Sequence, residues 1–428
     1  MHMNIKIFKT IIIESQDLLM NLEISPRSFE FEEQAHYVFV GIRQAGKSYL
    51  LYHRARQLLT KGHDIHEMLF VNFDDERLIG MTADKLDLIL QAYTSMFDFK
   101  PIIFLDEIQN VEGWEHCARR LANQKYQVYI TGSNAKMLSR DIASTLGARY
   151  IEQTVFPYSF SEYLDALGIK IDKNWEYGIK RGEVYRALDS YFQWGGFPEL
   201  LMYVNKRLWL NELYEKIILG DIMLRNGIKN EHAFRLTIKR LAENIKNPTS
   251  YNRLSNMVKA TGVSTNAVSV MNYIQYCKDA CLLFTFDNYA SKFVEKETVK
   301  KHYFIDNGLL NIFLTDSETA LLENICASTL YRKTCSEIGF DIYYYNKEVE
   351  LDFYIPSRKY GIQACYSLEN QETEEREVRA LVTFHNLYGL ERAEIVTYSE
   401  DRIIHTPTLD IHVVPLARWI LDKTCWNG

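Results

Sequence analysis

Glycine and proline are scarce in this chain of 428 residues, with only 20 Gly and 8 Pro. Flexible linkers and low-complexity tracts are rich in these residues, so we expect none, and the domains should pack against one another. The chain also lacks the roughly 18 consecutive apolar residues that a membrane helix needs. No small-residue cleavage site follows the apolar segment near the start, so no secretory signal is expected.

Paired cysteines are missing as well. The seven cysteines are odd in number and scattered, and none forms a C-x-x-C pair, which favours reduced thiols in a cytoplasmic protein. The net charge of −7 argues against a protein coated with nucleic acid but permits a local basic patch. With 47% hydrophobic residues, the chain is predicted to be a globular protein of roughly two to four domains.

One segment, residues 41–48, fits the pattern G-x-x-x-x-G-K-[ST]. An apolar run at residues 37–40 precedes it and a helical apolar pattern follows it, so the motif lies between a buried strand and a helix. Such a loop surrounds phosphate oxygens with backbone N–H groups, and the helix N-terminus adds a positive dipole end. Lys47 is expected to reach the β- and γ-phosphates, and the Ser48 hydroxyl to bind Mg²⁺. The predicted nucleotide-binding residues here are Gly41, Ile42, Arg43, Gln44, Ala45, Gly46, Lys47, Ser48 and Tyr49.

A second apolar strand, at residues 101–105, ends in the adjacent carboxylates Asp106 and Glu107. At the carboxyl end of an α/β sheet both side chains can reach the crevice where ligands bind. Asp106 is expected to hold Mg²⁺ through water, and Glu107 to orient the attacking water. The alternative is a strand that ends in a solvated acidic turn, and the presence of Lys47 upstream disfavours it.

A third strand, at residues 128–132, is followed by Ser133 and Asn134. We expect this strand between the other two, where a polar side chain at its end lies beside the γ-phosphate. Asn134 is preferred over Ser133 as that sensor. The alternative is that both residues only cap the next helix.

The order of these motifs resembles that of AAA+-type P-loop ATPases of bacteria and archaea that carry a helical lid, a winged helix and a C-terminal nuclease-like domain. The matching segments are VGIRQAGKS, FVNFDDE, IIFLDEIQNVEGWE, YITGSNA, FPYSFSEYL, WGGFPE, YFIDNGL, LLEN, EVELDFYI and IQACYSL. The resemblance implies binding and hydrolysis of ATP by an α/β fold with a parallel P-loop sheet, and says little about biological role. It implies a P-loop domain at residues 1–156, a helical lid at 157–230, a winged helix at 231–305 and a nuclease-like domain at 306–428.

Two further roles rest on the resemblance. Arg149 follows the helix after the sensor, where many AAA+ proteins place an arginine finger that reaches the γ-phosphate in a neighbouring subunit. The Gly-Arg pair of the family is spread over three residues here, and the alternative is a surface arginine at a helix end. Pro198 lies in the turn at residues 194–199, where related lids pack a proline on the adenine; a plain interhelical turn is equally open.

Residues 231–302 are basic in an otherwise acidic chain, with eleven Lys or Arg against six acidic residues. A helix, a glycine turn and a second helix over residues 250–277 precede a strand pair, which is a helix-turn-helix pattern with a wing. The expected reading face is short and polar, and no Lys or Arg occurs on that helix until Lys278. Weak contact with DNA phosphates and packing against a protein both remain open.

The C-terminal segment resembles the PD-(D/E)XK nuclease core, with Glu323 on a helix, Glu350 and Asp352 on a strand, and a Gln363 to Cys365 segment on the next. That chemistry uses carboxylates to hold Mg²⁺ and a lysine near the activated water. The lysine would fall at Cys365, and a neutral thiol cannot supply its positive charge. We therefore expect a degenerate domain used for binding, with weak metal binding at Glu323 and Asp352 left open.

These patterns predict an Mg²⁺-dependent ATPase that drives or gates contact with a protein or nucleic-acid partner. The predicted catalytic residues are Lys47, Glu107, Asn134 and Arg149, and the predicted metal residues are Ser48 and Asp106. One alternative is a nucleotide-gated DNA- or protein-binding module with little turnover, and the other is an ATP-regulated nuclease. An arginine finger at Arg149 would require an oligomer.

Overall fold

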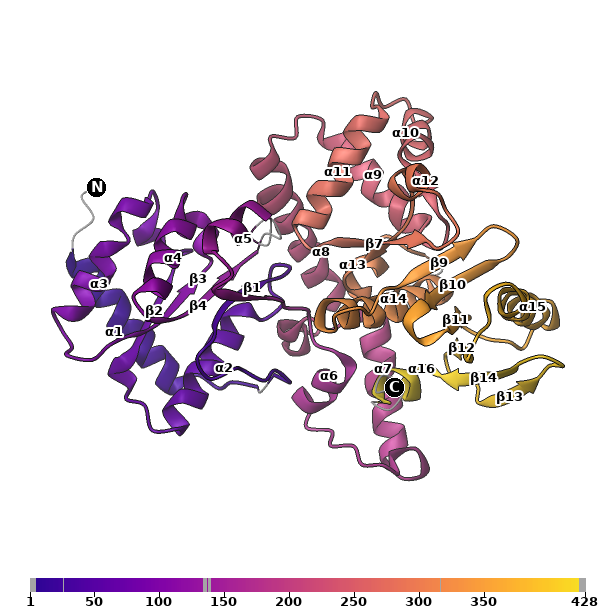
Figure 1. Cartoon of the computed structure of the whole chain (residues 1–428), viewed down its shortest axis with the longest axis horizontal. Coiled ribbons are helices and arrows are strands. Elements are labelled where there is room, and N and C mark those ends of the chain that lie inside the picture. Colours follow the sequence, from indigo (N-terminus) through magenta and orange to yellow (C-terminus); the bar gives the residue numbers. More distant parts are fainter. Residues whose placement is uncertain (1–4, 26, 134–136, 138–139, 316, 423–428) are drawn as a thin grey trace. The chain divides into compact units, whose positions relative to one another are not determined.

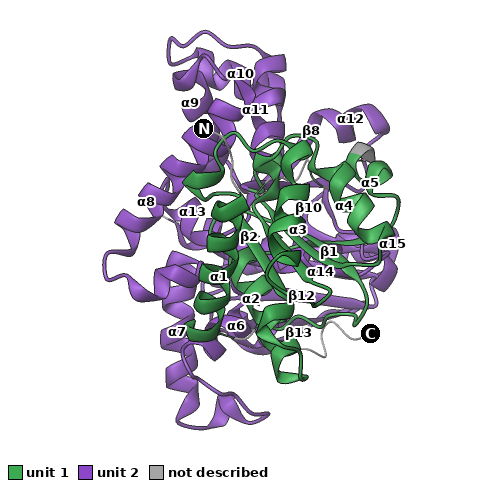
Figure 2. Ribbon diagram, turned by 90° about the vertical axis from the view of Figure 1, so that its left-hand side faces the viewer, with its two compact units in different colours: residues 1–156, 279–281 green, residues 157–278, 282–428 purple. Residues whose placement is uncertain are grey.

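The computed structural model describes residues 5–25, 27–133, 137, 140–315 and 317–422 (Figure 1). The chain forms two compact units, coloured separately in Figure 2. The first comprises residues 1–156 with 279–281, and the second comprises residues 157–278 with 282–428. No helix within the described residues is both long and apolar enough to cross a membrane.

The first unit is built on a five-stranded parallel sheet with the order β2-β3-β4-β1-β5. The strands are β1 (His36–Val40), β2 (Met68–Asn72), β3 (Ile102–Asp106), β4 (Gln127–Gly132) and β5 (Tyr150–Thr154). The predicted insertion of the third motif strand between the other two is confirmed, since β4 lies between β1 and β3. The α-helices are α1 (Ile5–Asn21), α2 (Lys47–Thr60), α3 (Asp87–Thr94), α4 (Trp114–Asn123) and α5 (Arg140–Leu146).

The two faces of this sheet differ in chemistry because successive side chains of a strand point to opposite sides. Aliphatic side chains such as Val38, Ile103 and Ile130 join a buried cluster with apolar residues of α1, α3 and α4. The other face is aromatic. Its rings stack across neighbouring strands, with centroids of Tyr129 and Phe104 5.0 Å apart.

Helix α2 contributes a buried arginine to the aromatic face. The guanidinium of Arg54 lies 4.9 Å from the ring centroid of Phe31, and its Nε donates to the Tyr129 hydroxyl at 2.7 Å. Arg54 is only 2% exposed, so these contacts fix the helix that follows the P-loop against the sheet.

The second unit begins with helices and continues into the segment predicted as a helix-turn-helix and then into a large sheet. The helices up to that segment are α6 (Phe160–Ala166), α7 (Lys180–Trp194), α8 (Lys206–Lys216), a π-helical stretch (Ile217–Leu224) and α9 (Glu231–Glu243). The segment itself consists of α10 (Tyr251–Lys259) and α11 (Ala267–Asp279). The later helices are α12 (Phe293–Thr298), α13 (Asn307–Asn311), α14 (Glu318–Ser336), α15 (Gln371–Tyr388) and α16 (Leu416–Leu421).

The sheet of the second unit has nine strands in the order β13-β14-β12-β11-β10-β9-β7-β8-β6. The first five along the chain are β6 (Thr249–Ser250), β7 (Leu283–Asn288), β8 (Val299–Phe304), β9 (Tyr343–Asn346) and β10 (Glu350–Ile355). The others are β11 (Tyr360–Ala364), β12 (Arg392–Thr397), β13 (Arg402–His405) and β14 (Asp410–Pro415).

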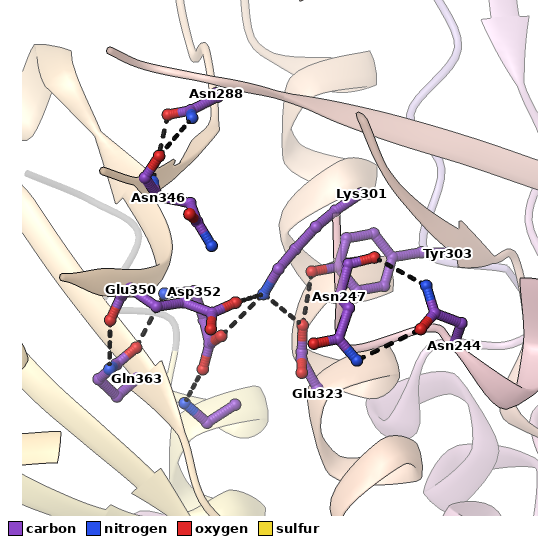
Figure 3. Close-up of polar contacts among 11 residues, drawn as sticks. Asn244, Asn247, Asn288, Lys301, Tyr303, Glu323, Asn346, Glu350, Asp352 and Gln363 are labelled. Carbon is purple, nitrogen blue, oxygen red and sulfur yellow. Dashed lines mark hydrogen bonds and ion pairs between the residues drawn. The ribbon is translucent and has the colours of Figure 1, made fainter. Parts of the chain in front are cut away.

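One parallel pairing joins the two halves of this sheet. In it, Asp287 of β7 is the partner of Tyr343 of β9. The Asn288 side chain strengthens the joint, because its Nδ2 donates to the Asn346 carbonyl at 2.9 Å (Figure 3). The predicted boundary between residues 305 and 306 therefore falls directly after β8, inside a continuous sheet, and strands from both predicted domains share that sheet.

The glycine turn after α7 is shaped by a buried carboxylate. The N–H of Gly196 donates to Asp306 Oδ2 at 2.8 Å, and the N–H of Gly308 donates to Oδ1 at 2.8 Å. Gly195 has φ +76°, and a Cβ there would lie 1.8 Å from Asp306 Oδ1. Burial raises the pKa of Asp306 to about 6, against the lowering effect of these N–H donors. The approach of Asp306 thus requires glycine at position 195, and the Tyr158 carbonyl oxygen, 2.2 Å from where a Cβ would lie, requires glycine at position 196.

Candidate nucleotide-binding site

The predicted P-loop connects β1 to α2 in a tight left-handed bend. Gln44 and Gly46 have φ of +61° and +92°, and Gly46 is the residue before the first turn of α2. Gly41 is needed for packing, since a Cβ there would lie 2.0 Å from the Val155 carbonyl oxygen. The bend places the open N-terminus of α2, with its unpaired N–H groups, at the end of the loop.

Lys47, the first residue of α2, is buried and faces the loop. Its Nζ donates to the carbonyls of Gly41 and Ile42, both at 3.1 Å, and lies 3.5 Å from Glu107 Oε1. The ammonium is therefore within reach of both the loop and the end of β3. An anion in the loop would meet this charge and the N-terminus of α2 together.

Asp106 is fully buried at the end of β3. The Thr131 hydroxyl of β4 donates to Asp106 Oδ1 and accepts from the N–H of Glu107 at 3.0 Å. Burial raises the pKa of Asp106 to about 6, although the hydroxyls of Thr131 and Ser48 lower it. Thr131 thus orients both acidic residues through one oxygen atom.

The implied Mg²⁺ can be tested against these residues. The second oxygen of Asp106, Oδ2, is buried and has no hydrogen-bond partner among the described residues. Ser48 lies near enough to influence the Asp106 pKa. An orphaned carboxylate oxygen beside a hydroxyl suits a cation that prefers oxygen ligands, so Ser48 and Asp106 fit the ion.

Glu107 has a left-handed backbone, with φ +52°, which is costly for a residue with a side chain. Gln109 Nε2 donates to Glu107 Oε2 and, at 3.2 Å, to Ser133 Oγ. Burial alone would raise the pKa of Glu107, but Lys47, Gln109 and Arg43 hold it below its ordinary value. Glu107 is therefore an ionised, oriented carboxylate at neutral pH.

Four further residues were predicted for the site. Asn134 lies outside the described residues, and its sensor role stays a prediction. Arg149 is exposed, and its Nη1 donates to the carbonyls of Leu146 and Gly147 at 3.4 and 3.0 Å, so it caps the end of α5; a finger role stays a prediction. Tyr49 is 42% exposed on α2. Pro198 begins a short 3₁₀ turn (Pro198–Met202) in the second unit, and its contact with adenine stays a prediction.

Three contributors to the site escaped the sequence analysis. Arg27 donates to the carbonyls of Ala45 and Phe156, at 3.1 and 2.8 Å, and so ties the P-loop to the end of β5. Thr131 and Gln109 hold the two acidic residues. A usable signal existed only for Thr131, which is a polar residue in the otherwise apolar run of a central strand.

Comparisons with known proteins bear on these units. Residues 33–164 match a family model described as an AAA domain, and residues 185–320 match a domain family of unknown function. An uncharacterized protein of Methanocaldococcus jannaschii is 29% identical over 429 residues, which cover 97% of this chain and 95% of that protein. An uncharacterized protein of Haemophilus influenzae is 29% identical over 277 residues, 64% of this chain and 67% of its own.

Solved structures align more loosely. A Walker-type ATPase of Pyrococcus abyssi aligns with a TM-score of 0.42 and 15% identity, over 69% of this chain and 99% of that one. The AMPPCP-bound DnaA of Aquifex aeolicus aligns with a TM-score of 0.26 and 13% identity, over 62% of this chain and 86% of that one. Alignments this loose carry no conclusion about activity. Residues 33–164 are thus similar to an AAA domain, and the P-loop bend and the order of the parallel strands agree with that match.

Proposed function

We propose that the protein binds ATP with Mg²⁺ at residues 41–48 and hydrolyses it by in-line attack of water on the γ-phosphorus. The observation that carries this proposal is the convergence of Lys47, Asp106 and Glu107 at the carboxyl ends of β1 and β3. Mg²⁺ at Ser48 and Asp106 would offset negative charge on the β- and γ-phosphates.

The side chains have separate roles in this proposal. Lys47 exchanges its loop carbonyls for phosphate oxygens when the nucleotide binds. Glu107, ionised and held by Gln109, orients the attacking water. Thr131 keeps Asp106 and the Glu107 backbone in register with each other. This division predicts that different substitutions will impair binding and turnover separately.

The first test is steady-state ATP hydrolysis by Lys47→Ala. Loss of the ammonium should weaken nucleotide binding and lower turnover by roughly 100-fold or more, because a charge contact to the transferring phosphoryl group disappears. Lys61→Ala is the matched control, since Lys61 is 53% exposed and pairs with Glu33 away from the loop. Turnover that survives unchanged in Lys47→Ala would remove the proposal.

A second substitution separates binding from chemistry. Glu107→Gln keeps the shape of the side chain and its contact with Gln109 but cannot polarise water as a carboxylate does. We expect calorimetry to show ATP binding comparable to that of the parent protein, with hydrolysis lowered by roughly two orders of magnitude. Equal loss of binding and turnover would argue that Glu107 only holds Lys47.

The nucleotide state is proposed to gate contact with a partner through the helix-turn-helix segment. Its surface is less basic than the count of eleven suggests, because Lys301 is fully buried and Arg235 pairs with Glu215 and Glu231. Val268 on α11 and Phe293 on α12 are 63% and 78% exposed. Exposed apolar side chains of this kind favour a protein partner over DNA.

Band-shift assays with duplex DNA, with and without ATP, test the partner class. A DNA partner would give a salt-sensitive shift that weakens in Arg253→Ala and Lys259→Ala, two exposed basic residues of α10. We expect no shift in any nucleotide state. Should a salt-sensitive shift appear only with ATP, the alternative of a nucleotide-gated DNA-binding module is favoured instead.

A further inference from the structure

A cluster of three carboxylates lies in the second unit. Glu323 comes from α14, and Glu350 and Asp352 come from β10. Their side chains converge on one point, as Figure 3 shows. That point is occupied by the ammonium of Lys301, which enters from β8.

The Lys301 ammonium lies at nearly equal distances from the three carboxylates. Its Nζ lies 3.0 Å from Glu323 Oε1, 3.1 Å from Glu350 Oε1 and 3.0 Å from Asp352 Oδ1. The side chain has no exposed surface. An ammonium has three N–H donors, so each can meet a different carboxylate. Burial alone would lower the pKa of Lys301, but the surrounding carboxylates raise it well above its ordinary value.

Neighbouring groups hold the carboxylates around the ammonium. The Tyr303 hydroxyl, on the same face of β8 as Lys301, donates to Glu323 Oε1 at 2.7 Å. The N–H of Ala364 donates to Asp352 Oδ2 at 3.0 Å. Gln363 joins the strands, since its Oε1 accepts from the Asp352 N–H at 2.8 Å and its Nε2 donates to the Glu350 carbonyl at 3.0 Å. The cluster is therefore preorganised around a single positive charge.

The sequence analysis looked for a positive charge only at position 365 and did not anticipate Lys301. Cys365 is a neutral core residue, since burial raises its thiol pKa to about 11 and its Sγ contacts the Ser367 carbonyl at 3.2 Å. The positive charge comes instead from Lys301, a residue of a different strand that the sequence analysis counted only among the basic residues of 231–302. Sequence spacing cannot reveal this exchange, because β8 and β11 are not neighbours in the sheet.

A divalent ion does not fit the cluster as the structure has it. Among the described residues, no group of three or more His, Cys, Asp or Glu side chains is arranged to hold a metal ion. A metal at the point where the three carboxylates converge would have to displace the Lys301 ammonium. Expelling the ammonium would leave it buried without partners, which costs several kcal/mol in general.

We propose that Lys301 is the permanent cation of this cluster and takes the place of the divalent ion that the nuclease-like resemblance implies. The pocket beside Lys301 then binds no metal ion. The pocket is about 950 Å³, and its described lining includes seven acidic but only three Lys or Arg side chains. Without a bound metal such a surface repels phosphodiesters. We therefore expect the pocket neither to bind nor to cleave nucleic acid.

The experiment measures Mn²⁺ binding and thermal unfolding of the full chain without nucleotide, slightly above pH 7. At this pH Glu323 can ionise, since burial raises its pKa to about 7. All proteins carry Asp106→Asn, so that the P-loop site contributes nothing. The series compares this parent with Lys301→Met, which keeps the length of the side chain and removes its charge, and with Lys301→Met/Asp352→Asn.

We expect the parent to unfold at the same temperature in EDTA and in Mn²⁺ and to give no binding isotherm. Lys301→Met should bind one Mn²⁺ per chain and gain thermal stability from it, and Asp352→Asn should abolish that gain. If Lys301→Met fails to fold, the parent and its Asp352→Asn variant decide. Mn²⁺ binding to the parent that disappears in Asp352→Asn would overturn the proposal, and so would a folded Lys301→Met that binds no Mn²⁺.

Discussion

A carboxylate with no exposed surface is unfavourable unless a partner offsets the loss of hydration. Within the described part of the chain, Asp106 has such a partner on one oxygen, and burial raises its pKa to about 6. Between the ordinary pKa of aspartate and about 6, the folded chain retains a proton that the unfolded chain has released. The free energy of unfolding therefore falls as pH rises through this window, and this contribution is constant above it.

Asp106→Asn should accordingly stabilise the nucleotide-free protein. Near pH 7 we expect the variant to gain roughly 2 kcal/mol in the free energy of unfolding, and the difference should vanish below about pH 4. Denaturant titrations at several pH values measure it. Asp98→Asn, at an exposed position of the same unit, is the control and should show no such trend.

The placement of single residues was predictable where a short motif fixes it. Lys47, Asp106 and Glu107 lie where the spacing indicated, because a strand that ends in carboxylates beside a P-loop has few alternatives. Their supporting residues were not predictable. Gln109 reaches Glu107 only because the latter has a left-handed backbone, a conformation that the sequence does not signal for glutamate.

The Gly195–Gly196 turn lies between α7 and the 3₁₀ turn that begins at Pro198. The sequence predicted this turn correctly but not the reason that it requires glycine. The glycines were expected to break a helix, and they do follow α7. Their immediate reason is the buried Asp306 carboxylate and the Tyr158 carbonyl, both of which lie too close for a Cβ. No local pattern indicates a partner more than a hundred residues away.

Gly196→Ala should therefore unfold the second unit more easily. Its Cβ would lie 2.2 Å from the Tyr158 carbonyl oxygen, and we expect a loss of roughly 3 kcal/mol in the free energy of unfolding. Gly182→Ala in α7 is the matched control, because its Cβ meets only Arg186 Nη1, at 3.6 Å. That substitution should gain up to about 1 kcal/mol, since alanine favours a helix over glycine. Equal effects of the two substitutions in chemical denaturation would contradict this account.

At the scale of the whole molecule, the second unit is one compact unit despite its three predicted parts. The pairing of β7 with β9 joins the hairpin after the helix-turn-helix to the C-terminal strands. Lys301 and Tyr303, on β8, neutralise and bind Glu323 on α14. The resemblance to separate family domains did not predict this sharing of strands.

A fragment of residues 306–428 should consequently fail to fold. It retains the buried Glu323 without the ammonium and hydroxyl that satisfy it, and β9 loses the strand beside it. A fragment of residues 157–428 contains every partner and should give a cooperative unfolding transition. Circular dichroism with thermal melting compares the two, and cooperative unfolding of the shorter fragment would refute the prediction.

The placement of Lys301 and Asp306 on one short segment has a consequence for how the chain pairs its strands. Sliding β8 by a single residue would turn Lys301 to the opposite side of the sheet and withdraw Asp306 from the turn at Gly196. Each error would leave a buried charged group without its partner. The misaligned pairing is therefore disfavoured at two positions, which lie roughly 17 Å apart along an extended chain. Electrostatic interactions, and not the apolar pattern alone, thus help to fix the strand register of this hairpin.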